Sequence, residues 1–389
     1  MSRASFSPAI RFVVLIGFVS LFADMTYEGA RSVTGPYLGM LGASAFLVSA
    51  VGGLGELAGY TLRLFSGRLS DKTGRYWTIT VIGYLLNLLS VPALALTGSW
   101  QSAAGLVIVE RVGRAIRNPP RDAMLSHATH EIGRGWGFGL HEAMDQTGAL
   151  IGPLLIALVL SYKGTYHVGF AVLLVPAVVS LLVLVLAQRQ YPDPMQLEAG
   201  LPSGLASGMS ARFWLYTIGA GLIAAGYADF SLIAFHFSRT AIFSQHTIPL
   251  TYALAMGVSA LAALIFGKLF DHVGLASAAI GIIGAAAFAP LIFLSNSRLA
   301  LGGMLLWGMG LGVQESALRA HIATMVPSAR RASAYGVFDT VFGVFWFAGS
   351  LIMGGLYGHS MTALITFSVL TQVASVPLLL SGIKNKSQI

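Results

Sequence analysis

The chain contains no cysteine among its 389 residues. This absence excludes disulfides, zinc–thiolate centres, iron–sulfur clusters and cysteine nucleophiles. Charged residues are also scarce, at 10% of the sequence, against about a quarter in an average soluble protein. A soluble protein of this length needs more polar surface than so few charges supply, so the composition argues against a soluble enzyme or binding module.

Apolar residues take the place of the missing charge. They make up 56% of the chain, and the mean hydropathy is +0.76. Stretches of about 20 such residues can cross about 30 Å of hydrocarbon as helices. We therefore predict an all-α membrane protein that needs no cofactor. Its twelve transmembrane helices are expected at 10–36, 43–66, 76–97, 101–121, 136–160, 165–188, 213–238, 249–269, 275–295, 299–325, 334–357 and 361–382.

The longest non-apolar interval, 189–211, is rich in proline, glycine and serine. We expect it to be a cytoplasmic linker between two six-helix bundles, 1–188 and 212–389. Basic residues concentrate in the loops on the side of the N-terminus, whereas the opposite loops hold only Lys163, Arg239 and Arg298. This asymmetry predicts cytoplasmic termini, and the short loops suit a bacterial inner (plasma) membrane. The net charge of +8 belongs to these loops and does not indicate nucleic-acid binding.

One motif, G-x-L-x-D-x-x-G, occurs at 67–74 and again at 267–274. Each copy lies between two apolar stretches, and its central acid is Asp71 in the first copy and Asp271 in the second. A membrane chain with two similar halves indicates a transporter built by duplication.

Twelve helices, the duplication and this loop together resemble the major facilitator superfamily over the whole chain. The family's loop between helices 2 and 3 reads roughly G-x-L-a-D-r-x-G-r-[RK], and the residues here that match it are Gly67, Leu69, Asp71, Gly74 and Arg75. In the family this Asp locks the two halves in the outward-facing state, and the resemblance implies a gating role for Asp71. A solvated loop without such a role is the alternative.

The fifth predicted helix carries a second motif, Gly148-Ala-Leu-Ile-Gly152-Pro153. It resembles the G-x-x-x-G-P motif of the superfamily's drug/proton antiporters, which implies a seal against proton leak and favours export. Gly148 and Gly152 lie about one helical turn apart, so a neighbouring helix can pack closely there. Ordinary packing of small residues is the alternative interpretation.

The first predicted helix carries three ionisable residues, Asp24, Glu28 and Arg31. Their spacing places them on one helical face, with Asp24 about 18 Å along the helix from Phe12, near the membrane midplane. Ionisable groups at this depth are costly and mark proton or ion pathways. We expect a proton-coupled or cation-binding site, with a self-neutralised helix end as the alternative.

The fourth and fifth predicted helices carry more such residues: Glu110, Arg111, Arg114, Arg117, His141, Glu142 and Asp145. Five of them are candidates for substrate or proton binding: Arg111, Arg114, His141, Glu142 and Asp145. Arg114 and Asp145 both lie about 10–14 Å from the inner surface, so we predict that they pair. The pair either opens when Asp145 is protonated or is a permanent structural bond. Arg111 and Arg114 also resemble the family's helix-4 arginine motif, but Ala115 replaces its glycine and leaves open which arginine corresponds.

Three more carboxylates lie in apolar surroundings and complete the candidates for substrate or proton binding: Glu56, Asp229 and Glu315. The function that these features favour is proton-coupled export of a small solute by a monomer. A divalent-metal or other cation transporter is one alternative, because His141 and Asp145 are four residues apart on one face; a proton-coupled uptake permease is another. An enzyme is not expected, because the chain lacks H-E-x-x-H, G-x-S-x-G and phosphate-loop motifs.

Overall fold

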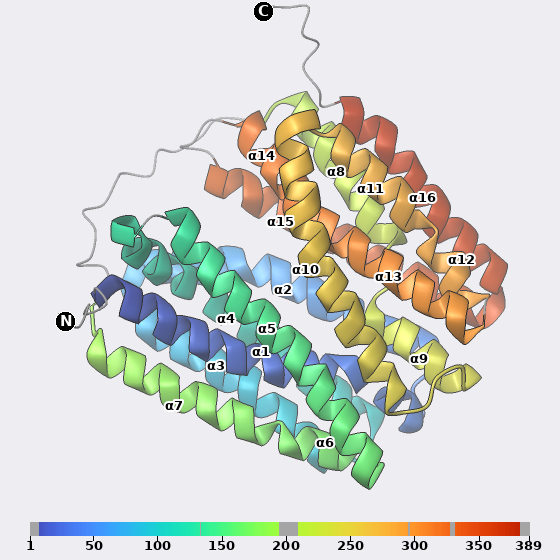
Figure 1. Ribbon diagram of the computed structural model, residues 1–389, viewed down its shortest axis with the longest axis horizontal. Coiled ribbons are helices and arrows are strands. Elements are labelled where there is room, and N and C mark those ends of the chain that lie inside the picture. Colours follow the sequence, from blue (N-terminus) through green and yellow to red (C-terminus); the bar gives the residue numbers. More distant parts are fainter. Residues whose placement is uncertain (1–7, 133, 194–208, 295, 327–330, 382–389) are drawn as a thin grey trace, which may run out of the picture. The chain divides into compact units, whose positions relative to one another are not determined.

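In a computed structural model, the backbone is described for residues 8–132, 134–193, 209–294, 296–326 and 331–381. Within these ranges, the side chains of 71, 126–139, 163, 271, 323–324 and 331–333 are outside the description. The described residues form helices and connecting turns, with no β-strand among them (Figure 1). The all-α prediction is confirmed.

Each of the twelve predicted segments coincides with one helix or with a run of consecutive helices. In the N-terminal half these are α1 (Pro8–Met40), α2 (Ala45–Thr73), α3 (Tyr76–Ala93) with the 3₁₀ turn Leu94–Leu96, α4 (Trp100–Ile132), α5 (Arg134–Lys163), and α6 (Tyr166–Val172) with α7 (Leu174–Gln190). In the C-terminal half they are α8 (Ala211–Gly226) with α9 (Phe230–Thr240), α10 (Thr247–Val273), α11 (Ala276–Ala286) with α12 (Phe288–Phe293), α13 (Ser297–Val313) with a π-helical turn (Gln314–Leu318) and α14 (Arg319–Met325), α15 (Arg331–His359), and α16 (Met361–Ser381).

Judged on the described residues alone, ten of these segments are long and apolar enough to cross a membrane. The other two differ for separate reasons. α4 carries many charged residues along its 33 positions, and α13 ends after 17 residues, where the π-helical turn interrupts the α-helical pattern. Both continue as helical runs of spanning length, at about 1.5 Å per residue.

The two copies of the loop motif end their helices in the same way. Gly74 and Gly274 have φ of +64° and +62°, a conformation that side chains disfavour and glycine adopts freely. The amide of Gly74 donates to the carbonyl of Ser70 at 2.9 Å, and that of Gly274 donates to Phe270 at 2.8 Å. The motif glycines therefore serve as helix C-caps in both halves. The side chains of Asp71 and Asp271 are outside the description, so their gating role stays a prediction.

The chain divides into two compact units, 1–33 with 61–202 and 34–60 with 203–389. The predicted linker lies mostly outside the described residues. The second unit contains residues 34–60, which the sequence assigned to the N-terminal bundle. This first part of α2 packs on α15 through matched small residues: a Cβ on Gly53 would lie 2.7 Å from that of Ser350, and one on Gly354 would lie 2.7 Å from that of Ser49.

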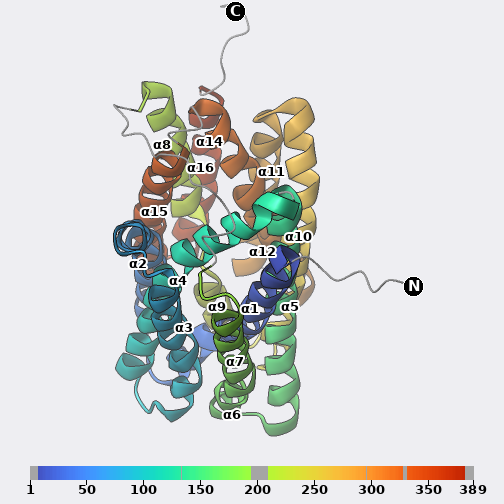
Figure 2. The same cartoon turned by 90° about the vertical axis from the view of Figure 1, so that its left-hand side faces the viewer.

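Within the second unit, α8 packs against both α15 and α16 (Figure 2). In the first unit, α3 packs against α4 and α7, and apolar residues of α1, α3 and α7 form a buried core. Trp77 of α3 contributes to this core and donates its indole N–H to the carbonyl of Tyr191 at 2.9 Å. These contacts hold together α1, α3, α4 and α7, and two of these helices, α1 and α4, carry candidate residues.

Candidate substrate and proton-binding site

The crossing of α1 and α5 is formed by backbone in close contact. A Cβ on Gly148 would lie 2.2 Å from the Leu21 carbonyl oxygen, and one on Gly152 would lie 2.3 Å from that of Met25. No side chain fits at either glycine without displacing a helix, so the G-x-x-x-G spacing is a packing motif here. α5 continues through Pro153 without ending. The crossing places Asp24 beside α5, since the same Cβ on Gly148 would lie 2.9 Å from the Cβ of Asp24.

Asp24 and Asp145 form the centre of this site. Asp24 is only 6% exposed and interacts electrostatically with Asp145, Arg117 and Arg114. The cations that act on Asp145 are Arg121 and Arg117. Within the described residues, Oδ1 of each aspartate lacks a hydrogen-bond partner. Two carboxylates that act on each other in a water-poor interior oppose simultaneous ionisation, so this arrangement suits the uptake of a proton.

Arg117 on α4 is the cation common to both aspartates, and the candidate list lacked it. Its side chain is 1% exposed, with the guanidinium 4.3 Å from the ring centroid of Tyr84 and 5.7 Å from that of Tyr27. Its Nε and Nη1 have no hydrogen-bond partner among the described residues. The signal in the sequence was the three-residue spacing of Arg111, Arg114 and Arg117, which places all three along one side of a helix.

Glu28 binds the next arginine along α4. Its Oε1 lies 3.8 Å from Nη1 of Arg114 and 3.7 Å from Nη1 of Arg31. The guanidinium of Arg114 also lies 4.4 Å from the ring centroid of Tyr27. Arg114 thus binds Glu28 of α1, whereas Arg121 and Arg117 act on Asp145. The predicted Arg114–Asp145 pair stays a prediction.

Arg111 pairs with its own neighbour. Its Nε lies 3.3 Å from Oε2 of Glu110, and Asn87 of α3 donates to Oε1 of Glu110 at 2.8 Å. Both members of the pair are buried. The hydrogen bond from Asn87 ties this buried pair on α4 to α3. A role of Arg111 in substrate or proton binding stays a prediction.

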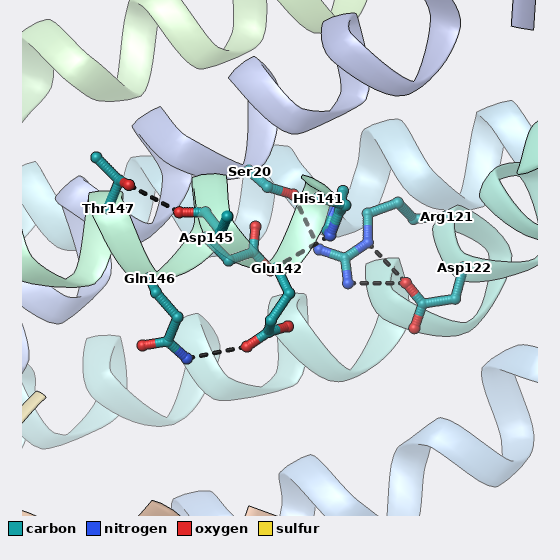
Figure 3. A network of polar contacts seen from close by, with 9 residues as sticks. Ser20, Arg121, Asp122, His141, Glu142, Asp145, Gln146 and Thr147 are labelled. Carbon is teal, nitrogen blue, oxygen red and sulfur yellow. Dashed lines mark hydrogen bonds and ion pairs between the residues drawn. The ribbon is translucent and has the colours of Figure 1, made fainter. Parts of the chain in front are cut away.

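His141 and Asp145 lie at the end of a chain of polar contacts (Figure 3). His141 Nδ1 lies 3.6 Å from Asp145 Oδ2, and His141 Nε2 lies 2.9 Å from the Ser20 hydroxyl. Arg121 donates to the same hydroxyl at 3.1 Å and binds Asp122 at 2.8 Å. Ser20, Arg121 and Asp122 were not among the candidates, because their proximity depends on how α1 crosses α4 and α5.

Glu142, the neighbour of His141 on α5, has its described contact within its own helix. It is exposed, and its carboxylate accepts a hydrogen bond from Gln146 at 2.9 Å. The pairing stays within one turn of α5. The alternation of His141 and Glu142 between buried and exposed follows from their adjacent positions on the helix.

In the second unit, Asp229 has a structural role at a helix break. The predicted segment 213–238 is interrupted between α8 and α9, and Asp229 caps α9 by accepting the amide of Ser231 at 2.8 Å. The carbonyls freed by the break have partners: Trp307 donates to Ala228 at 2.9 Å, and Ser368 donates to Gly226 at 2.6 Å. Irregular backbone at membrane depth is tolerated where protein satisfies it in this way.

Glu315 and Glu56 also belong to the second unit. Glu315 is exposed and lies in the π-helical turn, a geometry often found at functional sites. Just beyond it, Arg319 binds Asp339 of α15 at 3.3 Å. Glu56 is half-buried on α2. Across the described residues, no group of three or more potential metal ligands comes together.

Comparisons with known proteins show the family of this helical chain. A model of the Major Facilitator Superfamily matches residues 13–380. The chain belongs to the Major Facilitator Superfamily. A nucleoside transporter of known structure, NupG (D323A mutant), superposes with a TM-score of 0.76 over 94% of this chain and 99% of that one, at 13% identity. The likeness to NupG shows that the superfamily fold is shared.

Relatives of similar length fit this membership of the superfamily. An uncharacterized protein of Mycobacterium tuberculosis (strain ATCC 25618 / H37Rv) is 40% identical over 95% of this chain and 92% of its own length. An uncharacterized superfamily-type transporter of Methanocaldococcus jannaschii is 26% identical over 95% and 94%. The multidrug resistance protein MdtH of Aeromonas hydrophila is 27% identical, but over 53% of this chain and 50% of its own length. The chain is therefore a membrane transporter of this superfamily.

Proposed function

We propose that this chain exports a small solute in exchange for protons, with Asp24 and Asp145 as the residues that bind the proton. The observation that carries the proposal is the close α1–α5 crossing, which places Asp24 beside α5, the helix that carries Asp145. The two carboxylates interact electrostatically there, and Arg117 acts on both. Arg114 is bound by Glu28 and Arg121 by Asp122, which leaves Arg117 as the cation that the two interacting carboxylates share. A proton can neutralise the second carboxylate.

In the proposed exchange, the negative charge of Asp145 is neutralised by arginines in one state and by a proton in the other. With the site closed, Arg117 and Arg121 act on the ionised carboxylate. When α4 moves relative to α5, these cations withdraw and a proton takes their place, since an unpaired buried carboxylate is costly. Alternating access then couples proton uptake on one side to solute release on the other.

Export is supported by the partial similarity to MdtH, which is named a multidrug resistance protein. The resemblance of the helix-5 motif, including Pro153, to that of drug/proton antiporters also favours export, although its two glycines serve close packing on α1. The metal-transport alternative receives less support, because His141 and Asp145 meet without a third potential ligand among the described residues. We further propose a monomer in an inner (plasma) membrane, with both termini in the cytoplasm, as the loop charges indicate.

The test uses proteoliposomes with an imposed pH gradient and a panel of small organic compounds. Proton movement on compound addition is followed with a pH-sensitive dye. We expect Asp145→Asn to abolish gradient-driven accumulation while compound exchange without a gradient persists, because the amide cannot take up the proton. Asp193→Asn, which changes an exposed carboxylate after α7, is the matched control. Accumulation by Asp145→Asn at the wild-type level would refute the coupling role.

Orientation can be tested separately, since the natural chain has no cysteine. Ser99→Cys and Lys72→Cys each introduce one thiol at an exposed position on opposite predicted sides. A membrane-impermeant maleimide added to intact cells is expected to label the cysteine at 99 and not the one at 72. The reverse pattern would place the termini outside.

A further inference from the structure

In the chain of polar contacts that ends at Asp145, each residue can donate a hydrogen bond to the next one. Arg121 can only donate, so the Ser20 oxygen accepts from its Nη1 at 3.1 Å. Ser20 is fully buried, and its own hydroxyl proton needs an acceptor. Nε2 of His141 lies 2.9 Å away and can supply a lone pair.

If Nε2 accepts, the neutral imidazole carries its proton on Nδ1. That nitrogen faces Asp145 Oδ2 at 3.6 Å, slightly beyond a formed hydrogen bond and within reach of a small ring rotation. Donors then follow one another from Arg121 to Ser20 to His141, and the last N–H is aimed at the carboxylate. The tautomer of a histidine is set in this way by the bond that its other nitrogen makes.

We propose that Arg121 and Ser20 fix the Nδ1-protonated tautomer of His141 and make it a positioning residue that donates to Asp145. The proposal rests on the proposed function for its transport consequence, but not for the tautomer itself. A fixed donor stabilises the ionised carboxylate, so it biases when Asp145 exchanges its proton.

The surroundings of His141 come from three helices. On α4 they are Arg121, Asp122 and Arg117, which act on it electrostatically, and on its own helix Asp145 faces Nδ1. α1 contributes Ser20. The competing acceptor for the Ser20 hydroxyl is the Asp145 carboxyl, which also interacts with it. The hydroxyl lies 2.9 Å from His141 Nε2, a normal hydrogen-bond distance, which favours the histidine as its acceptor.

The tautomer is measured by ¹⁵N NMR of the full chain in lipid nanodiscs, labelled at histidine. His141→Asn identifies the resonances by their loss. We expect wild type to show a neutral ring with an unprotonated Nε2. Ser20→Ala is expected to move a substantial fraction of His141 to the Nε2-protonated form. Ser102→Ala, which removes an exposed hydroxyl bound to Ser99, is expected to change nothing.

An Nε2-protonated ring in wild type would mean that Ser20 donates to Asp145, and the proposal would be overturned. An unchanged tautomer in Ser20→Ala would also overturn it. Loss of proton coupling in wild type, with the tautomer as expected, would instead count against the proposed function alone.

The effect on Asp145 is tested with two substitutions of His141 in the proteoliposome assay. Asn places an amide N–H near the position of Nδ1, whereas Gln extends towards Nε2 and Ser20. We expect His141→Asn to keep gradient-driven flux within about threefold of wild type and His141→Gln to lose about tenfold, which corresponds to one charge-assisted hydrogen bond. Equal fluxes in the two variants would show that the Nδ1 side has no role, and circular dichroism checks that both fold.

Discussion

The α1–α5 crossing offers a direct test of how packing supports the site. Gly148→Ala adds one methyl group, whose carbon would lie 2.2 Å from the Leu21 carbonyl oxygen. Ordinary contact begins at 3.4 Å, so one helix must move by about 1.2 Å. Overpacking of this kind costs about 1–3 kcal/mol, and the obstacle here is backbone, which cannot rotate away.

The matched control is Gly105→Ala on α4 of the same unit. Nothing lies within 4 Å of a Cβ at that position. Alanine is a better helix former than glycine by up to about 1 kcal/mol, so this variant is expected to be as stable as wild type or slightly more stable. The two changes are chemically identical and differ only in what the methyl group meets.

The assay is thermal unfolding in detergent, followed by circular dichroism, with proton-coupled flux measured in parallel. We expect Gly148→Ala to unfold at a lower temperature than wild type. At temperatures where the variant is still folded, we also expect its proton-coupled flux to be reduced, because the displacement separates Asp24 from α5. If Gly148→Ala and Gly105→Ala unfold at the same temperature, the crossing is looser than described and the placement of the two carboxylates loses its support.

Two further predictions concern the helix break and the loop motif. Trp307→Phe removes the donor to the Ala228 carbonyl and is expected to destabilise the protein by about 1–3 kcal/mol in thermal unfolding. The control Trp214→Phe, at an exposed position, is expected to change stability little. Equal unfolding temperatures for the two variants would show that the hydrogen bond from Trp307 does not stabilise the break. Asp71→Asn, on the motif resemblance, is expected to slow transport several-fold while the amount of protein in the membrane stays the same, and unchanged flux would leave the loop without a gating role.

The sequence by itself determined the architecture. Apolar runs long enough to span hydrocarbon can satisfy their backbone only as helices, so each of the twelve predicted segments contains helix. The repeated motif also gave the two C-cap glycines, because a glycine after a helical run is the residue that adopts positive φ without strain. Both the helices and the glycine C-caps follow from the local sequence and do not depend on which other helix lies nearby.

Tertiary structure decided which charges meet. Helical periodicity placed Glu28 and Arg31 on one face, and they do pair, but it gave no information on the rotation of α4 against α1 and α5. That rotation gave Arg114 to Glu28 and placed Arg117 between the aromatic rings, since the approach of two helices is set by which small residues allow close contact.

The break in the 213–238 segment was hidden for the same reason. Gly226 and the capping residue Asp229 are compatible with a helix end, but the apolar run continues on both sides of them and hides the break. The break persists because Trp307 and Ser368, far along the chain, supply donors to the freed carbonyls. Local sequence shows that a helix break leaves backbone carbonyls without partners, which is unfavourable. Only the folded chain brings up the distant donors that bind these carbonyls.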